Sequence, residues 1–240
     1  MQLDSAATAS VTRALLLSRE SSSAEPGPVR VSLPARRSSP PSRVGANRDD
    51  PLMIADEVIA ELTAPPFRHY DDLAARSPAA PPRTHGLYAW WQVSGALPGV
   101  PGVPHPTEPL ELLYVGTAPR DAKSKSHLRK RLGNHHRAAI GSSTFRLDLT
   151  AFLWEREGWQ PCWTDRPKLP GSDIAALADW QRRHLRVRWV ECAAPWDLER
   201  DAVHAMRPPL NRDHNQRHPF YEVVGNARDV LRDAARVRPC

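Results

Sequence analysis

The stretch Leu112–Arg137, LLYVGTAPRDAKSKSHLRKRLGNHHR, decides the fold. Its apolar start ends at Tyr114-Val115-Gly116, and a polar, basic loop follows. A short apolar run bounded by turn residues predicts a buried strand. The leucines at 128 and 132 share one face of a helix, and Ser126 is a suitable N-cap residue. We therefore expect a strand that leads into a basic, phosphate-facing helix over Ser126–Ala139.

Positive charge is concentrated in this same stretch. Seven Lys or Arg residues and one Asp lie between Arg120 and Arg137, an excess equal to the formal net charge of +6 of the whole chain. A local basic patch is typical of a nucleic-acid-binding surface, although a lone basic run is also compatible with a solvated helix face. The candidates for phosphate contacts are Lys123, Lys125, Arg129, Lys130 and Arg137.

The segments around this stretch indicate an α+β fold. His85–Val93 and Glu111–Gly116 are short and rich in aromatic or apolar residues, so they predict two antiparallel strands joined by the Gly- and Pro-rich loop Ser94–Pro109. Leu185–Cys192 alternates between apolar and polar residues and predicts a half-buried strand. Apolar spacing predicts helices over Pro51–Leu62, Ser143–Trp154, Ile174–His184, Pro195–Arg207 and Asn226–Arg236.

Composition divides the chain into four parts. Residues 1–50 are rich in Ser, Ala, Pro and Arg and contain few large apolar residues, so they are expected to form a disordered tail. Residues 51–83 are expected to form a helical extension and a Pro-rich linker. The main domain is predicted over residues 84–222, followed by a C-terminal helix over 223–240.

The three cysteines, Cys162, Cys192 and Cys240, lie far apart and form no C-x-x-C pair. This spacing predicts neither a zinc finger nor a disulfide framework, and it favours a reducing, cytoplasmic location. No apolar run approaches the length of about 20 residues that a membrane span needs, so no membrane association is expected.

Five sequence features together resemble the GIY-YIG nuclease superfamily. Gly86-Leu87-Tyr88 and Tyr114-Val115-Gly116 resemble its two signature tripeptides, and Leu128–Leu132 (LRKRL) resembles the next motif, which is best known from an excision-repair nuclease subunit. Glu199, on a predicted helix, and Asn211, after Pro208-Pro209, match the acidic residue and the Asn that follow. Each feature alone is weak, but all five occur in the family's order.

The resemblance implies a fold and an activity. The fold is a small three-stranded antiparallel sheet flanked by helices. The activity is endonucleolytic hydrolysis of a phosphodiester in DNA, supported by one Mg²⁺ or Mn²⁺ ion and needing no small-molecule cofactor. The chain departs from the family in two insertions, between Tyr88 and Tyr114 and over Pro119–Lys125, and Thr117 stands where some members carry Lys.

The same residues suit phosphodiester chemistry. A single carboxylate such as Glu199 suits Mg²⁺, which keeps most of its water ligands. Arg131 offers a permanently charged fork to the phosphate, and His135 lies four residues further on, on the same face of a regular helix. Tyr88 and Tyr114 end two paired strands, where one phenol is expected to orient or deprotonate the attacking water.

Asn211 is expected to hold either the Glu199 carboxylate or nearby backbone by hydrogen bonding. Taken singly, each of these residues also fits a structural role, so the prediction depends on their coincidence. His214 and His218 are spaced four apart, but they lie in a predicted loop and are a weak candidate for a zinc site.

Two other function classes compete with the nuclease. The first is a binding module of the same fold that holds nucleic acid without cutting it, with Trp90, Trp91 or Trp163 stacking on bases. The second is a structural domain that binds a protein partner. The sequence leaves open the preferred DNA structure, the oligomeric state and the pathway, whether repair, restriction, mobile elements or defence.

Overall fold

The computed structural model describes residues 55–74, 76–136 and 140–240. The predicted N-terminal tail, the start of the first predicted helix and Arg137 lie outside these residues.

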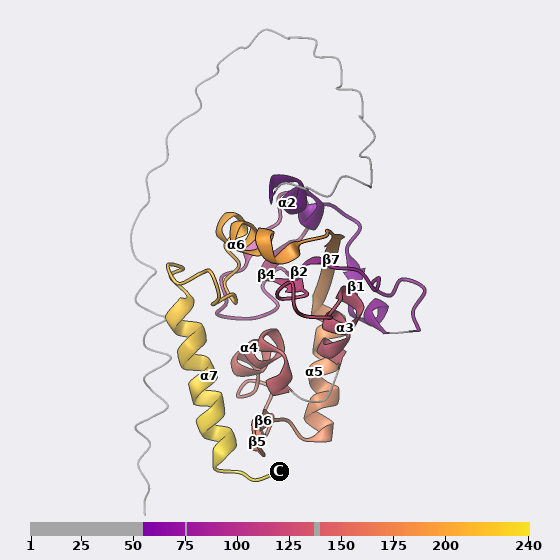
Figure 1. The fold of residues 1–240 in the computed structure, drawn as a ribbon. Helices are drawn as coiled ribbons and strands as arrows, with labels where there is room; N and C mark the ends of the chain where they lie inside the picture. The colour runs from indigo at the N-terminus through magenta and orange to yellow at the C-terminus, as the bar shows by residue number, and fades with distance from the viewer. Residues whose placement is uncertain (1–54, 75, 137–139) are drawn as a thin grey trace, which may run out of the picture. The chain divides into compact units, whose positions relative to one another are not determined.

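A five-stranded antiparallel sheet forms the centre of the fold, in the order β1-β7-β2-β4-β3 (Figure 1). The three long strands are β2 (Gly86–Val93), β4 (Leu110–Ala118) and β7 (Leu185–Glu191). The edges are β1 (Arg68–His69) and β3 (Val103–Pro104). A separate two-stranded sheet joins β5 (Cys162–Trp163) and β6 (Pro167–Lys168).

The described helices cover both faces of this sheet, which makes three layers (Figure 1). On one face lie α2 (Ala55–Thr63) and α6 (Pro195–Met206). On the other lie α3 (Leu128–Gly133), α4 (Thr144–Leu153), α5 (Gly171–His184) and α7 (Tyr221–Arg236). Short 3₁₀ turns occupy Tyr70–Leu73, Asn134–His136 and Ile140–Ser142.

Each layer has its own apolar core. Trp90 packs with the α4 side of the sheet, and its ring stacks on Phe145 at 5.1 Å between centroids. Its neighbour Trp91 packs on the α6 side, with Leu87 and Val203. Adjacent residues of a strand point to opposite faces, so a sheet covered on both sides buries both tryptophans.

The α+β class and the three long strands are confirmed, but the predicted three-stranded sheet is wrong because the sheet has five strands. The two additional strands contain two residues each, too few to show any periodicity. These two segments are strands only because Arg68 pairs with Val187 and Val103 pairs with Leu112. Such pairing between remote segments depends on the tertiary fold.

The basic helix is shorter than predicted. Helix α3 begins at Leu128 and ends at Gly133, and the chain continues as the 3₁₀ turn. The N-cap residue is His127, whose side chain accepts a hydrogen bond from the Lys130 amide, and not Ser126. The change of helix type means that residues four apart across Gly133 do not share one regular helical face.

Cys162 and Cys240 form a disulfide that ties the C-terminal end of the chain to β5. The prediction of no disulfide was therefore wrong, and this pairing removes the cysteine-based argument for a reducing compartment. Cys192 is a free thiol. Within the described part of the chain, no helix is both long enough and apolar enough to cross a membrane.

Candidate active site

The two central strands bring Tyr88 and Gly116 opposite each other. The Tyr88 ring is fully buried and lies directly over the glycine, because a Cβ atom on Gly116 would lie 2.5 Å from the Tyr88 hydroxyl oxygen and 2.9 Å from Cε1 of Tyr114. The ring centroids of Tyr88 and Tyr114 are 6.4 Å apart. Both signature tripeptides therefore meet at one point, where only glycine leaves room for the phenols.

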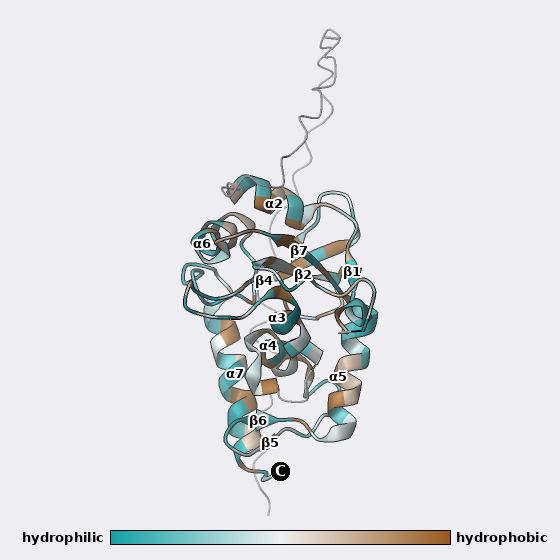
Figure 2. Ribbon diagram, turned by 45° about the vertical axis from the view of Figure 1, so that its right-hand side comes forward, coloured by the Kyte–Doolittle hydropathy of each residue, from teal (hydrophilic) through white to brown (hydrophobic). Residues whose placement is uncertain are grey.

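Arg131 extends from α3 to this point. Its Nε donates a hydrogen bond of 3.2 Å to the Tyr88 hydroxyl. The helix is held against the segment before β2, because the Leu128 amide donates to the Thr84 carbonyl at 2.9 Å. Much of α3 consists of hydrophilic residues, as its teal ribbon in Figure 2 shows. The neighbouring Tyr88 raises the pKa of Arg131, so the guanidinium stays charged.

Glu199 approaches from α6, on the other side of the sheet. Its Oε2 accepts a hydrogen bond of 3.3 Å from the Thr117 hydroxyl, one residue beyond the second tripeptide. Burial raises the pKa of Glu199 above its usual range, opposed by His214, the Thr117 hydroxyl and Arg131. The structure thus brings the carboxylate within electrostatic reach of Arg131, although the two residues belong to different layers.

Both phenols are neutral at physiological pH. Burial raises the pKa of Tyr88, and the charge and hydrogen bond of Arg131 oppose this shift without cancelling it. Burial also raises the pKa of Tyr114. The Glu199 carboxylate adds to both shifts, which again indicates that it lies near the two rings. The tyrosines can therefore orient a water molecule by hydrogen bonding, and neither carries a standing negative charge.

His135 lies behind the tyrosine rather than at the surface. It is only 2% exposed, and its ring contacts the edges of Tyr88, Trp90 and Phe145. Its Nδ1 lies 3.0 Å from the hydroxyl of Ser143, the N-cap residue of α4. In this position the imidazole holds the Tyr88 ring in place.

Asn211 does not contact the Glu199 carboxylate. Its Oδ1 accepts from the Val115 amide and its Nδ2 donates to the Val115 carbonyl, both at 2.8 Å. On the same edge of β4, the Leu210 amide donates a hydrogen bond of 3.1 Å to the Leu113 carbonyl. The side chain thus pairs with the outer edge of β4, where Val115 has no neighbouring strand, and fixes the strand that carries Tyr114 and Gly116.

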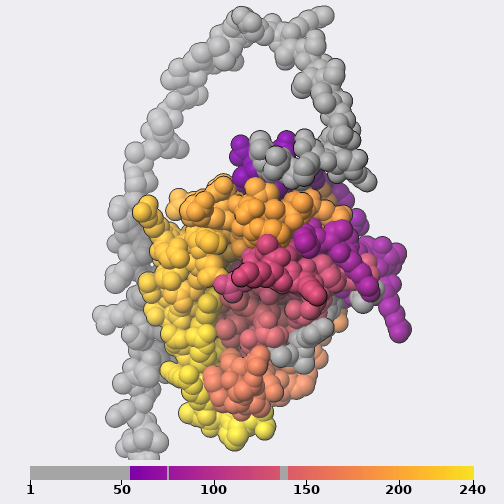
Figure 3. All heavy atoms as spheres, viewed as in Figure 1, coloured from indigo at the N-terminus to yellow at the C-terminus, as the bar shows by residue number. Residues whose placement is uncertain are grey.

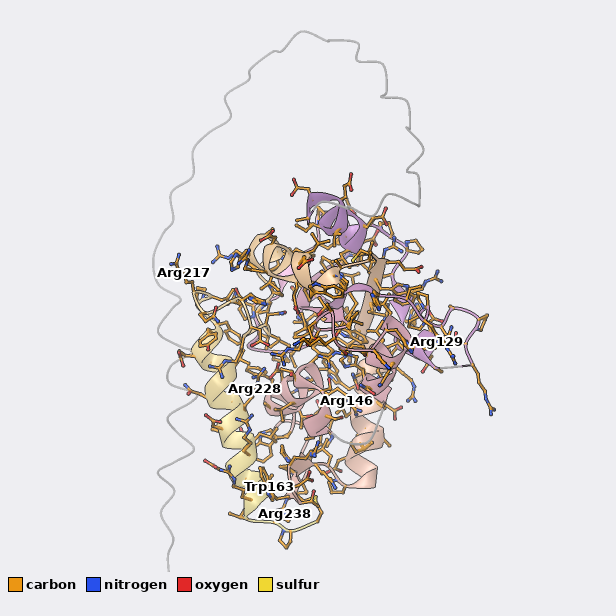
Figure 4. All side chains as sticks on the ribbon, in the orientation of Figure 1. Arg129, Arg146, Trp163, Arg217, Arg228 and Arg238 are labelled. Atoms are coloured by element: carbon orange, nitrogen blue, oxygen red, sulfur yellow. A yellow bond between two sulfur atoms is a disulfide. The ribbon has the colours of Figure 1, made fainter. Side chains whose placement is uncertain are left out.

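The four predicted phosphate-binding residues that the structure describes lie in or just before α3. Lys123, Lys125 and Lys130 are exposed. Arg129 is partly buried, because its Nε donates to the Pro81 carbonyl at 2.7 Å, and it lies away from α6 in Figure 4. In the space-filling view the orange atoms of α6 adjoin the crimson atoms of this region (Figure 3). The basic surface and the helix that carries Glu199 are thus neighbours.

Two features of the site were not predicted from the sequence. Thr117 holds the carboxylate, and its position directly after the second tripeptide was the available signal. Besides burial, His214 lowers and Asp213 raises the pKa of Glu199, and both residues follow Asn211 within three residues. His214 has a φ of 60°, in the left-handed region that non-glycine residues rarely adopt.

Two of the three tryptophans proposed for base stacking are buried, Trp90 at 0% and Trp91 at 3% exposure. Trp163 lies at the end of the molecule remote from α6 and packs under Arg236, with 5.0 Å from the guanidinium carbon to the ring centroid (Figure 4). Trp90 lies in the core behind the site, against His135, so none of these rings offers an exposed face beside the site.

The donor set suits a hard divalent cation. Among residues 55–74, 76–136 and 140–240, no group of three or more His, Cys, Asp or Glu gathers around one point, as a zinc site would require. Glu199 is a single carboxylate, and the Thr117 hydroxyl is hydrogen-bonded to it. Mg²⁺ is commonly bound in this way, by one or two carboxylates with water and substrate phosphate as the other ligands.

A protein-family model described as "GIY-YIG catalytic domain" matches residues 86–229. This region contains all the site residues described above and more than half of the chain, so the protein belongs to the GIY-YIG family. Membership indicates a nuclease domain and, with it, binding of nucleic acid. No match was found among curated proteins or among solved structures.

Proposed function

We propose that this protein is a metal-dependent endonuclease that hydrolyses phosphodiester bonds in DNA. One observation carries the proposal. Tyr88, Arg131 and Glu199 come from a strand, a basic helix and a helix of the opposite layer, yet they act on one another electrostatically at a single place. A purely structural fold has no need to bring a buried phenol, a guanidinium and a desolvated carboxylate together.

Each side chain has a role in this proposal. Arg131 binds the scissile phosphate and stabilises the charge that develops on it. Tyr88, which accepts a hydrogen bond from Arg131, orients the attacking water through its hydroxyl, while Tyr114 and His135 fix the position of its ring. Asn211 keeps β4 in register, and the exposed lysines around α3 attract the DNA backbone.

Glu199, held by Thr117, would bind the divalent cation, Mg²⁺ or Mn²⁺. When bound, such a cation stabilises negative charge on phosphate oxygens and lowers the pKa of water. Desolvation makes the carboxylate favour any nearby cation, because burial penalises its uncompensated charge.

The test compares wild type with Glu199→Gln on plasmid, nicked and flapped DNA, in Mg²⁺, Mn²⁺ or EDTA. We expect cutting by wild type with metal, and none in EDTA or by Glu199→Gln. The matched control is Asp201→Asn, an exposed acid two residues further along α6, which points to another side of the helix. This control should cut as wild type does.

A second variant separates turnover from affinity. Arg131→Ala should lower kcat by about 10²–10³-fold, the usual cost of losing one transition-state donor, with a much smaller change in DNA affinity. If Glu199→Gln cuts as well as wild type, the proposed function is wrong. If wild type binds DNA but cuts no substrate with either metal, a binding module with this fold replaces the enzyme.

A further inference from the structure

An aromatic pair lies beside the candidate site. Trp196 is in the first turn of α6, three residues before Glu199, so the two side chains are on neighbouring parts of one helix face. The Trp196 ring contacts the His85 ring, with 6.0 Å between centroids and 63° between planes. His85 is exposed and Trp196 is partly exposed. Neither ring belongs to the two apolar cores.

The pair is held in place by backbone on both sides. The Nδ1 atom of His85 lies 3.2 Å from the Ala193 carbonyl, just before α6, and its own carbonyl accepts from the Cys192 amide at 3.2 Å. The preceding residue, Thr84, accepts the first amide of α3. The segment at 84–85 thus links the basic helix to the helix that carries the carboxylate.

Positive groups surround this segment. Burial lowers the pKa of His127, and Arg83, Lys130, Arg129 and His85 lower it further, so all four lie near His127 at the start of α3. Arg83 and Lys130 are exposed. Linked neighbours therefore lead from these cations at α3 to the His85–Trp196 pair and on along α6 to Glu199.

We propose that Trp196 and His85 form a stacking subsite for one unpaired nucleobase next to the scissile phosphate, which makes single-stranded or frayed DNA the preferred substrate class. The inference rests on the proposed function, since it places the base relative to the phosphate that Arg131 and Glu199 act upon. Aromatic rings flanked by cations are the arrangement by which proteins bind single strands. A base inside a duplex is stacked on its neighbours and cannot meet the ring.

The experiment measures binding in EDTA, where no cutting occurs. Single-stranded oligonucleotides carry 2-aminopurine at one of several successive positions, and its fluorescence falls when it stacks on an aromatic ring. We expect quenching at one position in wild type and no quenching with Trp196→Ala. Trp196→Phe should keep most of it. Trp163→Ala, which removes a ring at the remote end of the molecule, is the matched control and should behave as wild type.

Affinity gives a second readout. Trp196→Ala should bind the single strand about 5–150-fold more weakly, the range expected for losing one base–aromatic stack, and bind the same sequence as a duplex with little change. His85→Ala should weaken single-strand binding in the same direction. Unchanged duplex affinity shows that the variants are folded.

Two results would overturn the inference. One is the absence of position-specific quenching in wild type, which needs no variant to interpret. The other is equal single-strand affinity of Trp196→Ala and wild type. Cleavage in Mg²⁺ is scored separately. If wild type shows quenching but cuts no DNA, the base-stacking subsite is supported and the proposed nuclease activity is refuted. If wild type cuts DNA but shows no quenching, the nuclease activity is supported and the subsite is refuted.

Discussion

Replacing Gly116 by alanine tests the central packing of the site. The added Cβ would lie 2.5 Å from the Tyr88 hydroxyl oxygen and 2.6 Å from its Cζ. The Tyr88 ring is fully buried, so it cannot move aside without displacing its neighbours. The substitution must therefore push the ring away from β4 or separate β4 from β2.

The size of the effect follows from this overlap. Forcing one extra methyl group into a packed core usually costs about 1–3 kcal/mol. In a domain of this size that corresponds to a fall in Tm of roughly 2–12 °C. A shift of the ring also lengthens the 3.2 Å hydrogen bond between the Tyr88 hydroxyl and Arg131. We therefore expect lower nuclease activity in addition to lower stability.

The assay combines thermal or urea unfolding of the full chain with plasmid cleavage at a temperature where the variant is folded. Gly133→Ala is the matched control, because nothing lies within 4 Å of its Cβ position at the end of α3. There alanine should be neutral or stabilising by up to about 1 kcal/mol, since glycine is the poorer helix former.

A double variant isolates the cause. In a Tyr88→Ala background the Gly116→Ala change should cost much less, because the ring it collides with is gone. Unaltered stability and activity of Gly116→Ala would refute the packing argument. An equal cost with and without the Tyr88 ring would show that the strain lies elsewhere.

Three further predictions concern the framework of the fold. Asn211→Ala leaves two main-chain groups of β4 without partners, so urea unfolding should show a loss of about 2–4 kcal/mol, and Asn211→Asp should lose at least as much at neutral pH, because a buried carboxylate oxygen would face the Val115 carbonyl. Burial raises the pKa of Asp148 to about 6. Between pH about 4 and about 6 the folded state therefore keeps a proton that the unfolded state has released, so the free energy of unfolding should fall as the pH rises through this range. A pH profile of stability identical to that of Asp148→Asn would contradict this prediction. Thiol titration of the unreduced, unfolded chain should find only Cys192, and reduction of Cys162–Cys240, which spans 78 residues, should cost about 4 kcal/mol of stability.

Sequence patterns predicted the elements that have enough residues to show a period. The strand over His85–Val93 is observed from Gly86, and the helices over Ser143–Trp154 and Pro195–Arg207 are observed within one residue at each end. In these segments local propensity and burial favour the same structure. The C-terminal helix begins at Tyr221, five residues earlier than predicted from Asn226.

The features that sequence patterns did not predict depend on contacts between remote segments. The alternative of a binding module would need exposed Trp90 and Trp91 rings, yet the sheet is covered on both faces and buries both. The disulfide joins Cys162 to Cys240 without any short spacing that could indicate it. The order of the motifs placed Tyr88, Arg131 and Glu199 in one hypothesis. The hydrogen bond from Thr117 to the Glu199 carboxylate was not predicted, because it joins residues 82 positions apart.

The pairing of Asn211 with Val115 has a consequence for biosynthesis. The two residues are 96 positions apart, and Glu199 is also far along the chain from the tyrosines. A chain still emerging from the ribosome has already made its phenols and its basic helix, but it lacks both the carboxylate and the amide that secures the strand. The site therefore cannot be assembled before the segment that carries Glu199 and Asn211 has been translated.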